Sequence, residues 1–203
     1  MNLKRVFDFV SSVCLLAAFS PVMLVAALLI KLNMGSPIFF KQIRAGLYGS
    51  HFYIYKFRTM IDAKDEYGEF LPDAVRVTRL GRFLRNFSLD ELPQLYNVSR
   101  GDMSLVGPRP LLLKYLPYYS ARESLRHTVR PGITGLAQIS GRNLLSWDEK
   151  LELDAKYVEN WSLWLDLKIL FLTFLRVVNR SGVVSVQDSM MLALDKEREL
   201  KIN

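Results

Sequence analysis

Three carboxylates lie within the stretch FSLDELPQLYNVSRGDMSLVGPRP: the adjacent pair Asp90 and Glu91, and Asp102 directly after a glycine. An aspartate can attack phosphorus and form an acyl phosphate, which is a known form of covalent catalysis. Carboxylates beside arginines can also hold Mg²⁺, because hard cations take oxygen ligands and bridge phosphate oxygens. The stretch therefore predicts a site for phosphate chemistry, with Asp90 as the nucleophile and Asp90 and Asp102 as candidate metal ligands.

The same residues have a structural explanation. Ser88 and Glu91 fit a helix-capping box, in which the serine is the N-cap and the glutamate follows three residues later. On the local pattern alone this explanation is favoured, although Pro93 would then lie beyond the first helical turn, where proline is poorly tolerated. Both explanations can hold together, because a helix N-terminus also stabilises a transferred phosphate.

Arginines recur at intervals of three before the carboxylates. We expect a helix over residues 76–86, which would place Arg76, Arg79, Arg82 and Arg85 near one another on its surface. A solubilising helix face is the simplest explanation. These four arginines have no acidic residue among them, however, and guanidinium groups are well suited to phosphates or lipid headgroups. After the carboxylates, the rigid turn at residues 107–110, Gly-Pro-Arg-Pro, presents one more guanidinium.

A β-hairpin is expected between residues 36 and 60. The runs PIFFKQI and HFYIYKFRTM are rich in aromatic and β-branched residues, and the turn residues at 45–50 separate them. Lys56 and Arg58 would share one face of the second strand, because side chains alternate along a strand. Without further context, a solvated strand face is the favoured explanation for these two cations.

The N-terminal segment 6–30 is almost continuously apolar, and Ser20-Pro21 interrupts it. Pro21 removes a helical hydrogen bond and should kink or break the helix, which leaves two halves that are each too short to span a bilayer. Basic residues flank both ends of the segment, and basic residues favour the cytoplasmic side. We therefore predict a membrane helical hairpin over residues 1–32; a proline-kinked straight span remains the alternative, and a cleaved signal peptide is disfavoured.

The C-terminal part carries two more predicted helices. Ser146 and Glu149 form a capping signal before a helix over 147–160. Residues 161–178 are very apolar, and Asp166 and Lys168 near their start favour an interfacial membrane helix over a transmembrane one, with a core helix as the alternative. Residues 181–203 carry no strong signal and are predicted to form a peripheral tail.

Composition limits the classes of function. The chain has 203 residues, a formal net charge of +7 and one cysteine, Cys14, so an internal disulfide and a cysteine-based zinc cluster are excluded. The absence of a disulfide framework favours a reducing cytoplasmic environment. The positive charge suggests anionic partners. Nucleic acid is a poor candidate, because the N-terminus suits a membrane and no nucleic-acid motif occurs.

A family resemblance adds to this reading. It rests on five segments in one order: YKFRTM at 55–60, SLDELPQL at 88–95, GDMS at 101–104, GPRP at 107–110 and VRPGITG at 129–135. Together they resemble the bacterial polyprenol-phosphate phosphoglycosyl transferases of the small monotopic type. The likeness extends from the N-terminal helix to about Val178. The phrases PRPLLLKYLPYY and SGRNLLSW look most similar to the members that transfer diacetylbacillosamine phosphate in protein N-glycosylation.

The resemblance implies a two-step reaction that requires Mg²⁺. Asp90 and Glu91 match the family's Asp-Glu dyad. Asp90 would attack the β-phosphate of a UDP-sugar, release UMP and keep the phosphosugar, which undecaprenyl phosphate would then take. The first candidate sugar is diacetylbacillosamine, followed by N-acetylated hexosamines, galactose and glucose. The candidate substrate-binding residues are Arg85, Arg109, Arg142, Lys56 and Arg58.

The resemblance also implies an architecture and a location. We expect an α+β protein with a re-entrant membrane helix broken at Ser20-Pro21, a catalytic domain over 33–180 and interfacial amphipathic helices. It would be monotopic on the cytoplasmic face of the bacterial inner membrane, and contact with downstream glycosyltransferases is left open. The competing hypothesis is a non-catalytic membrane-surface module whose arginines bind acidic lipids.

Overall fold

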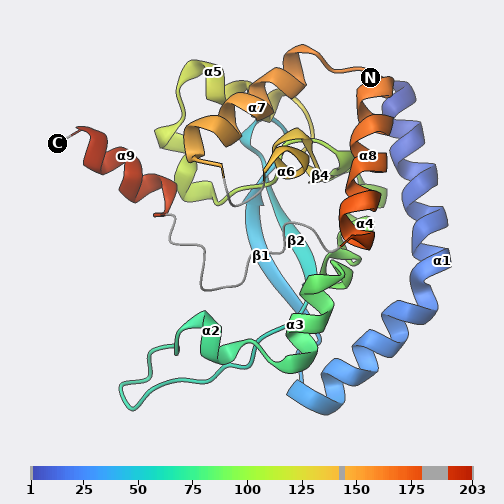
Figure 1. The fold of residues 1–203 in the computed structure, drawn as a ribbon, viewed down its shortest axis with the longest axis vertical. Coiled ribbons are helices and arrows are strands. Elements are labelled where there is room, and N and C mark those ends of the chain that lie inside the picture. The colour runs from blue at the N-terminus through green and yellow to red at the C-terminus, as the bar shows by residue number, and fades with distance from the viewer. Residues whose placement is uncertain (1, 142–144, 180–191, 203) are drawn as a thin grey trace.

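The computed structural model describes residues 2–141, 145–179 and 192–202. Helix α1, Asn2–Met34, runs along one side of the body and changes direction about halfway along its length (Figure 1). Pro21 lies inside this helix and has no backbone N–H to donate to the carbonyl of Ala17. The Ser20 hydroxyl donates to that carbonyl instead, at 2.8 Å. The predicted break at Ser20-Pro21 is therefore a bend within one continuous helix.

The apolar surface of α1 is mostly uncovered. Within the described residues, the segment Leu3–Met34 is the one helix long and apolar enough to cross a membrane, and 11% of its apolar window is buried. Leu24 and Leu32 are among the many exposed side chains. Such a surface is suited to lipid, because soluble monomers rarely expose large contiguous apolar patches.

Polar residues in the first turns of α1 attach it to the body. Asp8 is buried and accepts a hydrogen bond from the backbone N–H of Leu105 at 3.1 Å. The Arg5 guanidinium donates to the carbonyls of Val98 and Ser99 at 2.6 and 2.7 Å. Asp8 interrupts the apolar pattern in the sequence because it makes this buried contact, which fixes α1 relative to the rest of the chain.

The predicted β-hairpin is present. Strands β1, Phe39–Ala45, and β2, His51–Phe57, are antiparallel, with Phe40 opposite Lys56 and Arg44 opposite Phe52. Side chains directly opposite one another share a face of the pair. The even-numbered residues of both strands therefore share one face, which carries Gln42 and Arg44 as well as Lys56.

The arginine-rich segment is two helices instead of the single predicted one. Helix α2, Asp73–Arg76, ends before Thr78, and helix α3, Arg79–Asn86, begins after it. The Thr78 hydroxyl accepts from the backbone N–H of Gly81 at 2.9 Å and so caps α3. Arg76 is thereby separated from the other arginines, and its guanidinium stacks on the Phe70 ring, 4.4 Å from the centroid.

The remaining body is helix-rich around a small parallel pair of strands, β3, Ser104–Val106, and β4, Gly132–Thr134. The α+β prediction is confirmed to this extent. The other elements are α4, Gln94–Arg100; η3, Leu113–Tyr118; α5, Ala121–Ser124; η4, Leu125–Thr128; α6, Leu136–Ser140; α7, Trp147–Glu159; α8, Leu163–Val178; and α9, Leu194–Ile202. The main core cluster includes Phe52, Ile54, Leu95, Val98, Met103, Leu105, Val106, Tyr157 and Ile169.

Helix α8 lies beside the upper part of α1 (Figure 1). Its apolar residues Trp164, Phe171 and Phe174 are exposed, as the interfacial prediction requires. Asp166, however, is buried: it pairs with Lys4 and accepts a hydrogen bond from the Tyr157 hydroxyl at 2.7 Å. Asp166 therefore ties α8 to α1 and α7, and does not mark a headgroup-facing end of the helix.

Candidate active site

Asp90 and Glu91 lie in a tight turn between α3 and α4. The turn is the 3₁₀ helix η2, Leu89–Glu91, and Ser88 before it has a φ of 53° in the left-handed region. The Ser88 side chain makes no capping hydrogen bond, so the predicted capping box is wrong. A left-handed serine is a strained conformation that the surrounding structure must stabilise, and such strain often occurs at functional sites.

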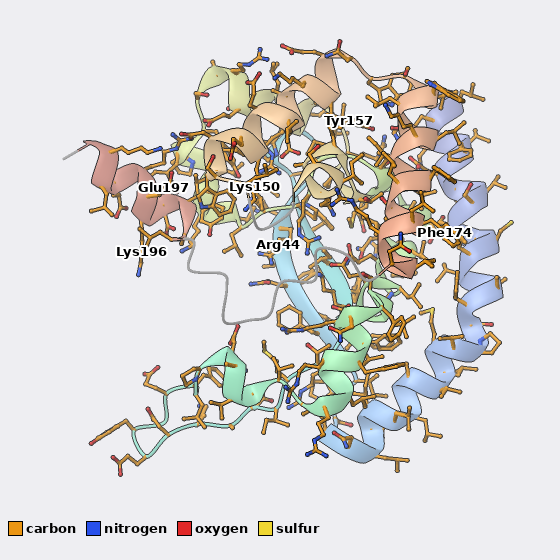
Figure 2. The ribbon with its side chains drawn as sticks, viewed as in Figure 1. Arg44, Lys150, Tyr157, Phe174, Lys196 and Glu197 are labelled. Atoms are coloured by element: carbon orange, nitrogen blue, oxygen red, sulfur yellow. The ribbon has the colours of Figure 1, made fainter. Side chains whose placement is uncertain are left out.

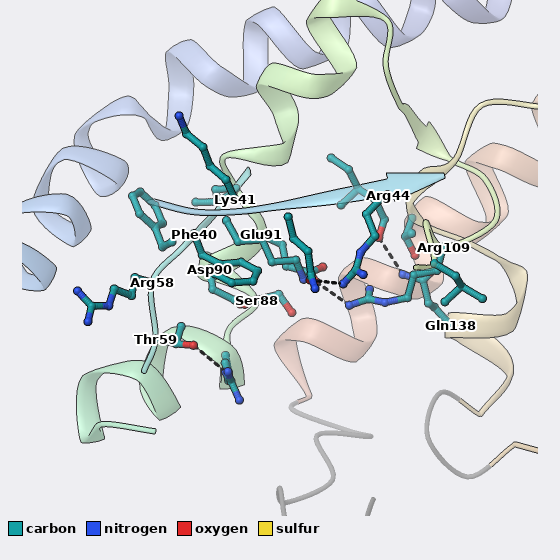
Figure 3. A pocket seen from close by; sticks show the side chains of 18 of the residues that line it. Phe40, Lys41, Arg44, Arg58, Thr59, Ser88, Asp90, Glu91, Arg109 and Gln138 are labelled. Carbon is teal, nitrogen blue, oxygen red and sulfur yellow. Dashed lines mark hydrogen bonds and ion pairs between the residues drawn. The ribbon is translucent and has the colours of Figure 1, made fainter. Parts of the chain in front are cut away.

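The turn opens onto a cavity of about 1430 Å³. Cations from distant parts of the chain converge on it (Figure 3). Its basic lining residues include Arg44, Lys56, Arg58, Arg85, Arg109 and Lys150, and its acidic ones include Asp90, Glu91 and Asp154. A large cavity with a cationic lining and two adjacent carboxylates is suited to a phosphorylated ligand.

Glu91 holds two of these cations. Its Oε1 accepts hydrogen bonds from the Lys56 ammonium at 2.5 Å and from the Arg109 guanidinium at 3.0 Å. Burial raises the pKa of Glu91, but the charges and hydrogen bonds of Arg109 and Lys56 outweigh it and lower the pKa to about 2. Glu91 is therefore a fixed carboxylate at neutral pH, and it aligns Lys56 and Arg109 at the cavity.

Asp90 has the opposite electrostatic environment. Burial, followed by the adjacent charge of Glu91, raises the pKa of Asp90 to about 6, against the opposing effects of Lys56, Arg85 and Arg109. Within the described residues, no hydrogen bond or ion pair engages its carboxylate. Asp90 is thus mainly ionised at neutral pH, more basic than an ordinary aspartate, and available to attack.

The structure brings most of the predicted substrate-binding residues to this cavity. The Arg85 side chain lines it and donates to the Thr59 hydroxyl at 3.0 Å. Arg58 also lines it, but its guanidinium donates to the Met60 carbonyl at 2.9 Å and pairs with Asp62 at 2.8 Å. Arg58 therefore supports the neighbouring loop, and its contact with substrate stays a prediction. Arg142 lies outside the described residues.

Asp102 is not brought to the cavity. It pairs with Arg100 at 3.4 Å and is not among the lining residues. Among the described residues, no group of three or more His, Cys, Asp or Glu side chains is placed to hold a metal. Mg²⁺ commonly binds through one or two carboxylates together with substrate phosphates, and a cavity that offers Asp90 fits that donor set. The magnesium requirement stays a prediction.

Sequence reasoning missed Arg44. Its Nη2 donates to Gln42 at 2.6 Å, while Nη1 is buried and has no hydrogen-bond partner within the described chain. Burial and the charge of Arg109 lower the pKa of Arg44. The signal was available in the strand pattern, because Arg44 and Gln42 are two residues apart and lie on the same face as Lys56.

Comparisons with known proteins define the class of this chain. A family model described as "Bacterial sugar transferase" matches residues 1–180, so the chain belongs to that family. An uncharacterized sugar transferase, EpsL of Bacillus subtilis (strain 168), is 55% identical over 90% of this chain and 91% of the relative. Membership confirms the prediction of an enzyme, a phosphoglycosyl transferase, and contradicts the hypothesis of a non-catalytic lipid-binding module.

Other relatives carry names that state a reaction, and two of them illustrate the range. The UDP-glucose:undecaprenyl-phosphate glucose-1-phosphate transferase of Caulobacter vibrioides is 48% identical over 84% of this chain and 67% of its own length. The UDP-N-acetylgalactosamine-undecaprenyl-phosphate N-acetylgalactosaminephosphotransferase of Aeromonas hydrophila is 41% identical over 89% of this chain, which spans 44% of that relative. The relatives thus share a reaction type but differ in the sugar.

Proposed function

We propose that the protein transfers a sugar-1-phosphate from a UDP-sugar to undecaprenyl phosphate and releases UMP. The observation that carries this proposal is the pairing at residues 90 and 91. Asp90 is a basic, unengaged carboxylate at a cation-lined cavity, and Glu91 aligns two of the cations. Relatives named for this reaction support the substrates.

The first step is an attack of an Asp90 carboxylate oxygen on the β-phosphorus. The new bond joins Asp90 to the phosphosugar, the bond from the β-phosphorus to the bridging oxygen breaks, and UMP departs with that oxygen and its electron pair. Lys56 and Arg109 offset charge on the phosphate oxygens, because donors prearranged in a cavity need no reorganisation during the reaction. Mg²⁺, when bound with Asp90 and the phosphates, would supply further charge neutralisation.

The second step regenerates Asp90. A phosphate oxygen of undecaprenyl phosphate attacks the same phosphorus, the bond to the Asp90 oxygen breaks, and undecaprenyl diphosphate sugar forms. The raised pKa of Asp90 suits both steps, because it reflects a carboxylate more nucleophilic than usual and yet still a competent leaving group at neutral pH.

The membrane arrangement belongs to the same proposal. Helix α1 and the exposed apolar face of α8 would hold the cavity at the cytoplasmic face of the inner membrane, with α1 entering and leaving on one side. The bend at Ser20-Pro21 supports that arrangement. Cysteine labelling at positions 3 and 33 tests it, and labelling from opposite faces would contradict the re-entrant model. Contact with glycosyltransferases that use the product is also proposed.

The sugar is the least constrained part. Diacetylbacillosamine remains the first candidate from the sequence resemblance, while the relatives are named for glucose, galactose and N-acetylgalactosamine. UMP release over a panel of UDP-sugars, with undecaprenyl phosphate in detergent, identifies the donor. If UDP-diacetylbacillosamine is the donor, we propose that the product is used in protein glycosylation.

Incubation of the full-length protein with a UDP-sugar labelled in the β-phosphate, without lipid acceptor, tests the mechanism. We expect a labelled protein adduct and one equivalent of UMP, and neither with Asp90→Asn. Ping-pong kinetics should follow when acceptor is added. Normal turnover without an adduct, or near-normal turnover of Asp90→Asn, would refute covalent catalysis at this residue.

A further inference from the structure

Helix α9 lies outside residues 1–180 that match the family, yet it docks on the catalytic body. Its first residue, Leu194, is fully buried in a cluster with Tyr115 and Leu151. The Trp147 indole donates to the backbone carbonyl of Leu192 at 2.8 Å. Residues 192–202 are therefore packed against η3 and α7, while residues 181–191 of the predicted peripheral tail lie outside the described ranges.

Ion pairs extend this contact over three elements. Lys114 of η3 pairs with Asp195 at 2.6 Å, Glu123 of α5 with Arg198 at 2.5 Å, and Asp148 of α7 with Arg198 and Lys201 at 2.7 and 3.0 Å. Single exposed pairs contribute little, but a network around a buried leucine fixes the position of a helix. Helix α9 thus links η3, α5 and α7.

The part of α7 that α9 contacts also lines the cavity. Trp147, Lys150 and Leu151 of α7 line it, and the Trp147 ring packs edge-on against Tyr115 with centroids 5.6 Å apart. The Lys150 ammonium lies 5.2 Å from the Trp147 ring centroid. The buried Leu194 side chain packs in the same cluster as Tyr115 and the lining residue Leu151, and so supports this wall of the cavity.

Glu197 on α9 pairs with Lys201 at 3.0 Å, and its negative charge also acts on Lys150 of this wall. Burial and then the charge of Arg109 lower the pKa of Lys150, and the negative charge of Glu197 opposes that shift. Arg109 and Lys150 line the same cavity, and their like charges disfavour one another there. Figure 2 shows Glu197 on the side of α9 nearer Lys150, and Lys196 on a different side. Lys196 is exposed.

We propose that α9 is a strap that positions Trp147 and Lys150 for the nucleoside diphosphate of the donor. Lys150 and Arg109 form an anion-binding wall, Leu194 fixes that wall, and Glu197 offsets the repulsion between its two cations. Glu197 and Leu194 are positioning residues, since they act through α7. This inference rests on the proposed function for the identity of the ligand.

The test uses full-length Glu197→Gln and Leu194→Ala, with Glu197→Asp as the conservative variant and Lys196→Gln as the control on the same helix. UMP affinity by calorimetry and the KM and kcat for the UDP-sugar are measured for each. We expect Glu197→Gln to raise the UMP Kd and the KM about three- to tenfold with little change in kcat, as loss of one partly screened charge contact predicts. Leu194→Ala should act in the same direction, Glu197→Asp should restore most of the affinity, and Lys196→Gln should match the wild type.

Unchanged UMP affinity and KM in Glu197→Gln and Leu194→Ala would overturn the strap. A fall in kcat alone, with KM unaltered, would overturn it as well. Failure of the proposed function has a different signature. In that case the wild type releases no UMP from any UDP-sugar, while the order of UMP affinities among the variants still supports the strap.

Discussion

Asp90 should destabilise the folded protein at neutral pH, and Asp90→Asn should relieve that cost. Its pKa rises from an ordinary 3.8 to about 6, mainly through burial and the charge of Glu91. Each pKa unit corresponds to about 1.4 kcal/mol, so the ionised side chain costs about 2 to 3 kcal/mol once its partial exposure is taken into account. Asparagine has nearly the same shape and carries no charge.

The sign and the pH window follow from linkage. Because the folded-state pKa lies above the unfolded one, the folded protein binds the Asp90 proton more tightly. The cost is therefore absent below about pH 4, grows as the pH rises towards 6, and is complete above it. Asp90→Asn should match the wild type at pH 4 and unfold with a free energy higher by about 2 to 3 kcal/mol at pH 7.5.

Thermal unfolding of the full-length protein in detergent between pH 4 and 8 measures this difference. For a chain of this size, about 2 to 3 kcal/mol corresponds to a rise in Tm of roughly 4 to 12 °C. Glu66→Gln, which removes an exposed carboxylate in the loop before α2, is the matched control and should change stability by less than about 0.5 kcal/mol. A gain that is independent of pH, or a less stable Asp90→Asn at pH 7.5, would refute the reasoning.

Three further predictions concern turnover. kcat/KM for the UDP-sugar should fall below an apparent pKa of about 6, since Asp90 must be ionised to attack, and a limb near 4 would contradict its raised pKa. Arg44→Lys should lower kcat/KM by about ten- to a hundredfold in initial-rate assays, because an ammonium cannot replace a planar guanidinium at a phosphate; unchanged kinetics would exclude Arg44 from the site. Glu91→Gln should lower kcat at least about tenfold by releasing Lys56 and Arg109, and should shift the acid limb of the pH profile to lower pH, because the like charge beside Asp90 is lost; a limb that stays in place would contradict their coupling.

Local signals predicted the elements that local contacts stabilise. The β-hairpin follows from aromatic and β-branched runs on either side of turn residues, and both strands form where they were expected. The helix after Ser146 begins as predicted, because its capping box forms within four consecutive residues. In such elements the residues that determine the structure are neighbours in the sequence, so the pattern is sufficient.

Predictions failed where distant residues decide the structure. Asp166 lies near the start of an apolar helix and suggested a headgroup contact, but its partner Lys4 is at the other end of the chain. Arg44 lies near Arg109, which comes from a distant segment of the chain, and no local pattern shows that proximity. A buried charge requires a partner, and the sequence alone does not say which one.

The motif Ser-x-x-Glu shows why the structure of the turn at Asp90 and Glu91 was hard to predict. It occurs at Ser120 and Ser146, and at both places the serine and the glutamate form a complete capping box. At Ser88 the same motif forms none, and Glu91 accepts hydrogen bonds from Lys56 and Arg109 instead of a backbone N–H. The exception is the place where strand β2 and the Gly-Pro-Arg-Pro turn bring two cations to the glutamate. A local rule is therefore overridden at the site where we propose that its residues take part in chemistry, and this is where such a failure is expected.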